Sequence, residues 1–173
     1  MRIRQICITL GCLACLGSLV APAATSRKPG LWEINSSTTW QKSPSLPGVN
    51  GKRLPSGSHV QQVCLTREMI EDYGALLPQS RGQCTVENRV LRPGKMTGEY
   101  VCKGMMMGKG SIDSVWSDDE HSIGTVHFLG TMVVGHDMEP VEWTTQSRAT
   151  FKSSDCGTVR PMPLPASSAS KHP

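Results

Sequence analysis

The stretch that decides the fold is Cys84–Lys103, which reads CTVENRVLRPGKMTGEYVCK. Two alternating polar and apolar segments, 84–91 and 95–103, flank a turn-forming Pro-Gly pair, so the stretch predicts a β-hairpin. Gly94 supplies the left-handed residue that a three-residue hairpin loop needs. A hairpin centred on Pro93 gathers the apolar residues on one face. It places Cys84 opposite Cys102, Val86 opposite Tyr100, Asn88 opposite Gly98, and Val90 opposite Met96.

The cysteines divide into two sets. Cys7, Cys12 and Cys15 lie in an apolar N-terminal stretch, and the other four of the seven lie in the body of the chain. An even number in the body indicates two disulfides formed in an oxidising compartment. The hairpin favours the pairing of Cys84 with Cys102, which leaves Cys64 for Cys156. Four cysteines allow three connectivities, and the other two stay open.

Residues 1–23 have the pattern of a secretory signal peptide. Two arginines, Arg2 and Arg4, precede an uncharged apolar run over 6–20, and Ala21-Pro22-Ala23 supplies small residues for cleavage. The run is shorter than the roughly 20 residues of a membrane-spanning helix. A lipoprotein is the alternative, but neither Cys12 nor Cys15 has a Leu-like residue three positions before it. We therefore expect a periplasmic or secreted protein.

Without these residues the 173-residue chain has the length of one domain. We expect a short leader at 24–27, a single β domain at 28–160 and a disordered, Pro- and Ser-rich tail at 161–173. The formal net charge of +4 includes Arg2 and Arg4, so the remainder carries only +2. That charge is too small to predict nucleic-acid binding. No second hydrophobic stretch predicts a transmembrane segment after signal cleavage.

The rest of the chain predicts a mainly β protein. Thr66 is positioned to cap a single short helix whose apolar residues, Met69, Ile70, Tyr73, Leu76 and Leu77, precede Pro78. The segment 141–152 alternates strictly, as in a sheet with one solvated face. The fold class is an antiparallel meander of about seven strands, a strongly curved sheet or partial barrel. Besides the hairpin, strands are expected at 31–40, 59–64, 110–117, 121–129 with a possible extension over 130–134, and 141–152, with turns at 118–120 and 135–140.

Several short motifs occur in a recognisable order. They are Lys28-Pro29-Gly30-Leu31-Trp32-Glu33, Cys64-Leu65-Thr66, the pair Cys84 and Cys102, and Asp155-Cys156-Gly157 followed by Pro161. Over roughly residues 28–161 the chain resembles a bacterial envelope family called domain of unknown function 3617. The resemblance implies a Gram-negative envelope location and no assigned activity. A Met-Pro-Gly-like element of that family corresponds here to Leu46-Pro47-Gly48, which lacks the methionine.

No set of residues predicts catalysis. A nucleophile needs an adjacent base and an orienting group, yet the body cysteines are assigned to disulfides and the histidines are dispersed. Asp118-Asp119-Glu120 is interpreted as a solvated turn. We expect a protein that is not an enzyme and has no cofactor.

Two binding functions remain as alternatives. An apolar concave face is expected to hold a small apolar ligand or to contact another envelope protein, and the sequence does not choose between them. Its candidate residues are Trp32, Tyr100, Trp116 and Trp143. The second-ranked hypothesis is copper binding, because thioether and imidazole ligands suit copper in an oxidising compartment. Its candidate ligands are His127, Met132, His136 and Met138.

Overall fold

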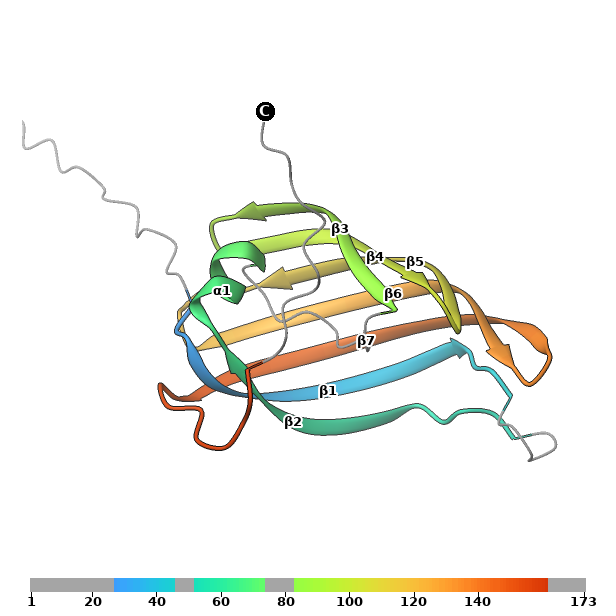
Figure 1. The fold of residues 1–173 in the computed structure, drawn as a ribbon, viewed down its shortest axis with the longest axis horizontal. Helices are drawn as coiled ribbons and strands as arrows, with labels where there is room; N and C mark the ends of the chain where they lie inside the picture. The colour runs from blue at the N-terminus through green and yellow to red at the C-terminus, as the bar shows by residue number, and fades with distance from the viewer. Residues whose placement is uncertain (1–26, 46–51, 74–82, 162–173) are drawn as a thin grey trace, which may run out of the picture.

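A computed structural model describes residues 27–45, 52–73 and 83–161 (Figure 1). The predicted signal peptide, most of the leader and the tail beyond Pro161, the end of the predicted helix and Leu46-Pro47-Gly48 lie outside these residues. The described part contains seven strands and one helix. They are β1 (Gly30–Lys42), β2 (Gly57–Leu65), α1 (Arg67–Tyr73), β3 (Cys84–Arg92), β4 (Lys95–Lys103), β5 (Met106–Val115), β6 (His121–Val134) and β7 (Asp137–Ser153).

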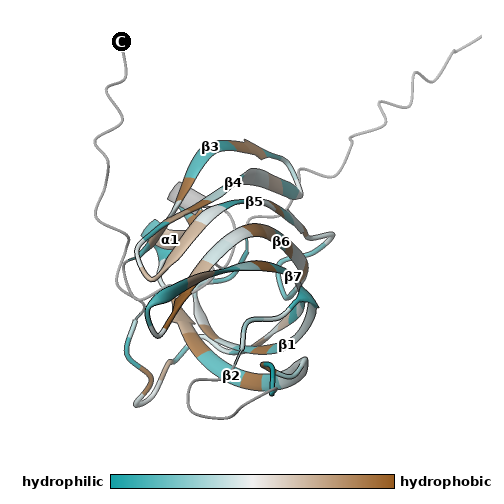
Figure 2. Cartoon of the chain, turned by 90° about the vertical axis from the view of Figure 1, so that its right-hand side faces the viewer, coloured by the Kyte–Doolittle hydropathy of each residue, from teal (hydrophilic) through white to brown (hydrophobic). Residues whose placement is uncertain are grey.

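The seven strands form one antiparallel sheet in the order β2-β1-β7-β6-β5-β4-β3. Strands β3 to β6 each pair with the next strand in the chain, β1 pairs with β7, and β2 pairs with β1. Figure 2 shows β3 at one edge of the sheet and β2 at the other. The sheet is not closed, since β2 and β3 do not pair with each other in the described part of the chain. The predicted mainly β, antiparallel fold with one short helix is confirmed.

The β3–β4 hairpin follows the predicted register as far as Glu87, which lies opposite Glu99. The register then shifts by one residue, so Val90 pairs with Thr97 and the predicted pairing with Met96 is wrong. Asn88, with φ of +50°, lies at the shift, and asparagine tolerates this left-handed conformation better than most residues. The irregularity is a β-bulge, which inserts an unpaired residue into one strand.

The turn of this hairpin is also shorter than predicted. Arg92 pairs directly with Lys95, so Pro93 and Gly94 form a two-residue turn and not a three-residue loop. Gly94 has φ of +72°, and a glycine with positive φ after a proline is the preference of a type II turn.

Two strands begin four residues before their predicted starts. Strand β5 begins at Met106, not at residue 110, and β7 begins at Asp137, not at residue 141. Val134 pairs with Asp137, so the predicted turn over 135–140 contracts to Gly135 and His136. Pro140 consequently lies inside β7. Proline is tolerated there because β7 extends beyond its pairing with β1 and has one partner strand only.

Two disulfides are present, and they are the pairings that the hairpin favours. Cys84–Cys102 joins the paired strands β3 and β4. Cys64–Cys156 joins the end of β2 to the segment that follows β7, across 92 positions of sequence.

Apolar residues on one face of the sheet form two buried clusters. The first cluster contains Met96, Tyr100, Cys102, Ile112, Val126, Phe128, Val141 and Trp143. The second contains Trp32, Ile34, Val63, Leu65, Met69, Ile70 and Ala149. Helix α1 contributes Met69 and Ile70 to the second cluster. Thr66 caps the start of this helix as predicted, because its hydroxyl accepts a hydrogen bond from the Met69 amide at 3.3 Å.

Candidate ligand-binding pocket

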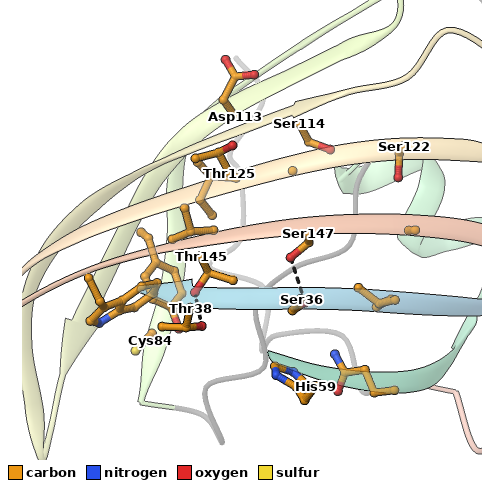
Figure 3. Close-up of a pocket in the computed structure, with 18 of the residues that line it drawn as sticks. Ser36, Thr38, His59, Cys84, Asp113, Ser114, Ser122, Thr125, Thr145 and Ser147 are labelled. Atoms are coloured by element: carbon orange, nitrogen blue, oxygen red, sulfur yellow. Dashed lines mark hydrogen bonds between the residues drawn. The ribbon is translucent and has the colours of Figure 1, made fainter. Parts of the chain in front are cut away.

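A pocket of about 580 Å³ lies on the buried face of the sheet (Figure 3). Both edge strands of the sheet contribute to its lining: β2 contributes His59 and Gln61, and β3 contributes Cys84. The remaining lining includes residues of β1 and β4–β7, which lie between these edges. This volume is within the range of small-molecule sites in proteins. The pocket exists because two levels of the sheet, each a row of register partners running across the strands, differ in side-chain size. One level carries small side chains and the other carries large aromatic side chains.

The first level, here called the small-residue layer, comprises Ser36, Ser147, Gly124 and Ser114. These residues are consecutive register partners across β1, β7, β6 and β5. The hydroxyls of Ser36 and Ser147 point toward each other and are hydrogen-bonded at 2.9 Å (Figure 3). Because none of the four side chains is larger than serine, space is left above this part of the sheet.

The second level, here called the aromatic layer, comprises Trp40, Trp143, Phe128 and Tyr100. Trp143 lies at its centre, stacked on Phe128 at 5.4 Å and edge-on to Trp40 at 6.5 Å and to Tyr100 at 6.3 Å. Phe128 is fully buried, whereas Trp40, Trp143 and Tyr100 line the pocket. Such rings offer large apolar surface to a ligand.

Gly130 leaves room for the Phe128 ring. A Cβ atom at residue 130 would lie 2.9 Å from Phe128 Cε1 and would also clash with the carbonyl oxygen of Met107. Any larger residue there would displace the ring against which Trp143 is stacked.

Arg27 lines the pocket and is only 3% exposed. Its guanidinium lies between two indole rings, 5.5 Å from the centre of Trp32 and 5.0 Å from that of Trp116. Nη2 donates to the Ser114 hydroxyl at 3.3 Å. Nε and Nη1 are buried and have no hydrogen-bond partner within the described residues.

Burial lowers the pKa of Arg27 to about 10, because removal from water disfavours the charged form. A group with this pKa is still protonated at neutral pH. The pocket therefore contains a buried positive charge.

The segment that carries Arg27 is held by the turn between β5 and β6. The Lys28 amide donates to the Asp119 carbonyl at 3.1 Å, and Lys28 Nζ lies 2.6 Å from Glu120 Oε1 and 3.2 Å from Asp119 Oδ2. These acidic partners raise the pKa of Lys28, Glu120 having the largest effect. The predicted turn at 118–120 thus anchors the N-terminal segment and positions Arg27.

Two of the four predicted ligand-binding residues line the pocket, namely Tyr100 and Trp143. Trp32 is fully buried in the second cluster with α1, and Trp116 packs at the edge of the first cluster. Both contact the Arg27 guanidinium instead of the pocket.

Sequence reasoning missed Trp40, Arg27 and the serines of the small-residue layer. The alternation Ile34, Ser36, Thr38, Trp40 places small polar residues on an otherwise apolar face of β1, and that pattern is a usable signal. For Arg27 the sequence offers no comparable signal, because its partners are distant in the chain.

The four candidate copper ligands do not come together. Met132 lines the pocket, whereas His127 is exposed and lies 3.4 Å from Glu142. Met138 is paired with Val133 and is exposed on the other face of the sheet from Met132, and His136 lies in the β6–β7 turn. His127 and Val133, the register partner of Met138, are six positions apart on β6, which corresponds to about 20 Å. His127 and Met138 are therefore too far apart to share a metal ion. The described residues contain no group of three or more His, Cys, Asp or Glu side chains that could hold a metal ion.

The helix in the described part of the chain is too short to cross a membrane. Fold and site together define a single-sheet antiparallel β protein with a side-chain-lined pocket on its buried face. The chain belongs to the family described as protein of unknown function (DUF3617), whose model matches residues 27–156. Comparison with curated proteins and with solved structures gave no match.

Proposed function

We propose that this protein is an exported, non-enzymatic binding module of the bacterial envelope, and that its pocket holds a small, largely apolar molecule. The pocket of about 580 Å³ carries the proposal. Residues of both edge strands line it, which supports a sheet that curves strongly around the pocket and presents a concave face. A concave apolar site with a few polar groups is the usual form of a small-molecule site.

The contacts of the hydroxyl groups support binding over catalysis. Ser36 is bonded to Ser147 at 2.9 Å, and Thr38 to Thr145 at 2.7 Å. Each hydroxyl is used by its neighbour on the next strand, whereas a nucleophile needs a base to accept its proton. These pairs hold β1 and β7 together and give the pocket wall a weakly polar band.

Export is supported by the composition of the chain. All four body cysteines form disulfides, which persist in oxidising compartments, and residues 1–23 have the signal-peptide pattern. Cell fractionation with N-terminal sequencing is expected to find a periplasmic or secreted chain that begins at Ala24. An intact N-terminus in the cytoplasm would contradict export.

Binding is tested with N-phenyl-1-naphthylamine, an uncharged dye whose fluorescence rises in apolar surroundings. The wild-type protein is expected to bind it saturably, and Ser147→Leu to weaken that binding at least about ten-fold by filling the pocket. Gln146→Leu is the matched control, because Gln146 is the exposed neighbour on the opposite face of β7. Equal binding by both variants, or no saturable binding by the wild type, would reject the proposed pocket function.

Native mass spectrometry of protein from its own envelope provides an independent test. A bound small molecule that dissociates on denaturation supports the proposal. A protein that carries nothing and also fails to bind the dye points to a protein partner instead.

A further inference from the structure

Resting on this proposed function, we infer that the ligand is a monoanionic amphiphile, such as a long-chain carboxylate, whose headgroup pairs with Arg27. The inference is carried by the burial of a guanidinium whose Nε and Nη1 have no hydrogen-bond partner in the described residues. A buried charge is costly unless it is paired and hydrogen-bonded. An anion in the pocket would supply both.

Among the residues that the structure describes, Arg27 has no acidic partner. Asp113 also lines the pocket, but its carboxylate lies 2.6 Å from Lys95 Nζ. Asp119 and Glu120 are paired with Lys28. One positive charge therefore remains to be balanced, which fits a headgroup with a single negative charge.

The donor geometry favours an oxyanion. Arginine has five N–H donors and no acceptor; Nε carries one of them and Nη1 two. Carboxylates form shorter and stronger hydrogen bonds with such donors than neutral acceptors do. Trp32 and Trp116 hold the guanidinium from two sides. The neighbouring residue Lys28 is hydrogen-bonded to the turn between β5 and β6. The guanidinium donors are therefore positioned before a ligand binds.

The pocket continues from Arg27 toward the aromatic layer. Ser114, the hydrogen-bond partner of Arg27, and Gly110, the register partner of Tyr100, are four residues apart on β5, or about 13 Å. Ile112 and Val126, register partners between these two levels, also line the pocket. A headgroup at Arg27 would thus direct its alkyl chain over apolar side chains toward Trp143.

The test compares decanoate with 1-decanol, which has the same chain length and no charge, by displacement of N-phenyl-1-naphthylamine. The wild-type protein is expected to bind decanoate at least about ten-fold more tightly, equivalent to about 1.4 kcal/mol. Arg27→Met is expected to weaken decanoate binding and thereby to abolish this preference. Arg148→Met is the matched control, because Arg148 is an exposed arginine on β7, and it should retain the preference.

The outcomes separate this inference from the proposed function. If decanoate and decanol bind equally to the wild type, or if Arg27→Met retains the preference, the headgroup inference is overturned while the apolar pocket stands. If the dye binds and neither compound displaces it, the headgroup inference is likewise overturned. If the dye itself does not bind, the proposed function fails as well. Dye binding by Arg27→Met shows that this variant is folded, and Arg27→Lys, which keeps the charge with fewer donors, should retain part of the preference.

Discussion

Removal of the two disulfides one at a time tests how each bridge stabilises the sheet. The double substitution Cys64→Ala/Cys156→Ala opens a link across 92 positions, and Cys84→Ala/Cys102→Ala opens one across 18. In the chain-entropy model a bridge stabilises the protein by restricting the unfolded chain, and a longer closed loop restricts it more. The model assigns about 4.6 kcal/mol to the long link and about 3.2 kcal/mol to the short link.

The comparison is controlled by the burial of the cysteines. Each bridge joins one buried cysteine, Cys64 or Cys102, to one half-buried cysteine, Cys156 or Cys84. The packing lost on replacement by alanine is therefore similar for both pairs, and the difference in free energy of unfolding reports mainly on loop length.

Urea denaturation at equilibrium, followed by tryptophan fluorescence, measures this difference. We expect the variant without the Cys64–Cys156 bridge to be less stable than the other by about 1.4 kcal/mol. Equal stabilities, or a larger loss for the Cys84–Cys102 variant, would refute the unfolded-state argument. Such a result would show that the bridges act through native-state contacts of the β3–β4 hairpin.

Three further predictions concern Phe128 of the aromatic layer, Gly130 beside it, and the contact of Ser45 with Glu139 of β7. Phe128→Ala should cost about 3–5 kcal/mol of stability in urea denaturation, because a fully buried ring that stacks on an indole is removed; a loss below 1 kcal/mol would contradict its place in the core. Gly130→Ala should cost about 1–3 kcal/mol by overpacking, whereas Gly57→Ala, with no atom within 4 Å of the new Cβ, should leave the unfolding midpoint unchanged. The Ser45 amide has the larger effect and the Ser45 hydroxyl the smaller in lowering the pKa of the Glu139 carboxyl from its ordinary value of 4.5. The contact therefore stabilises the fold fully above pH 4.5, and this stabilisation is lost as the pH falls through the lowered pKa. Hydrogen exchange at the Ser45 amide, corrected for its intrinsic rate, should show protection lost in that acidic range, and the Glu139→Gln variant should remove the pH dependence.

Local sequence patterns predicted a large part of the fold. A strand exposes alternate residues to opposite faces, so the alternation over 141–152 predicted which β7 side chains are buried, and Val141 and Ala149 are. The hairpin centred on Pro93 likewise predicted the register from Cys84 to Glu87. The bulge at Asn88 was not predictable from alternation, because it depends on one residue that adopts a positive φ.

The site, by contrast, is decided by contacts between distant segments. Ser36 meets Ser147 across 111 positions, and Arg27 meets Ser114 across 87. Alternation determines the face on which a side chain lies but not which strand becomes its neighbour, since a strand with one apolar face can pair with several others. The sequence by itself therefore determined strands and faces and favoured the observed bridges. Only the tertiary structure assembled the small-residue layer, by pairing β1 with β7, and buried Arg27 beside the pocket, by holding the N-terminal segment against the β5–β6 turn.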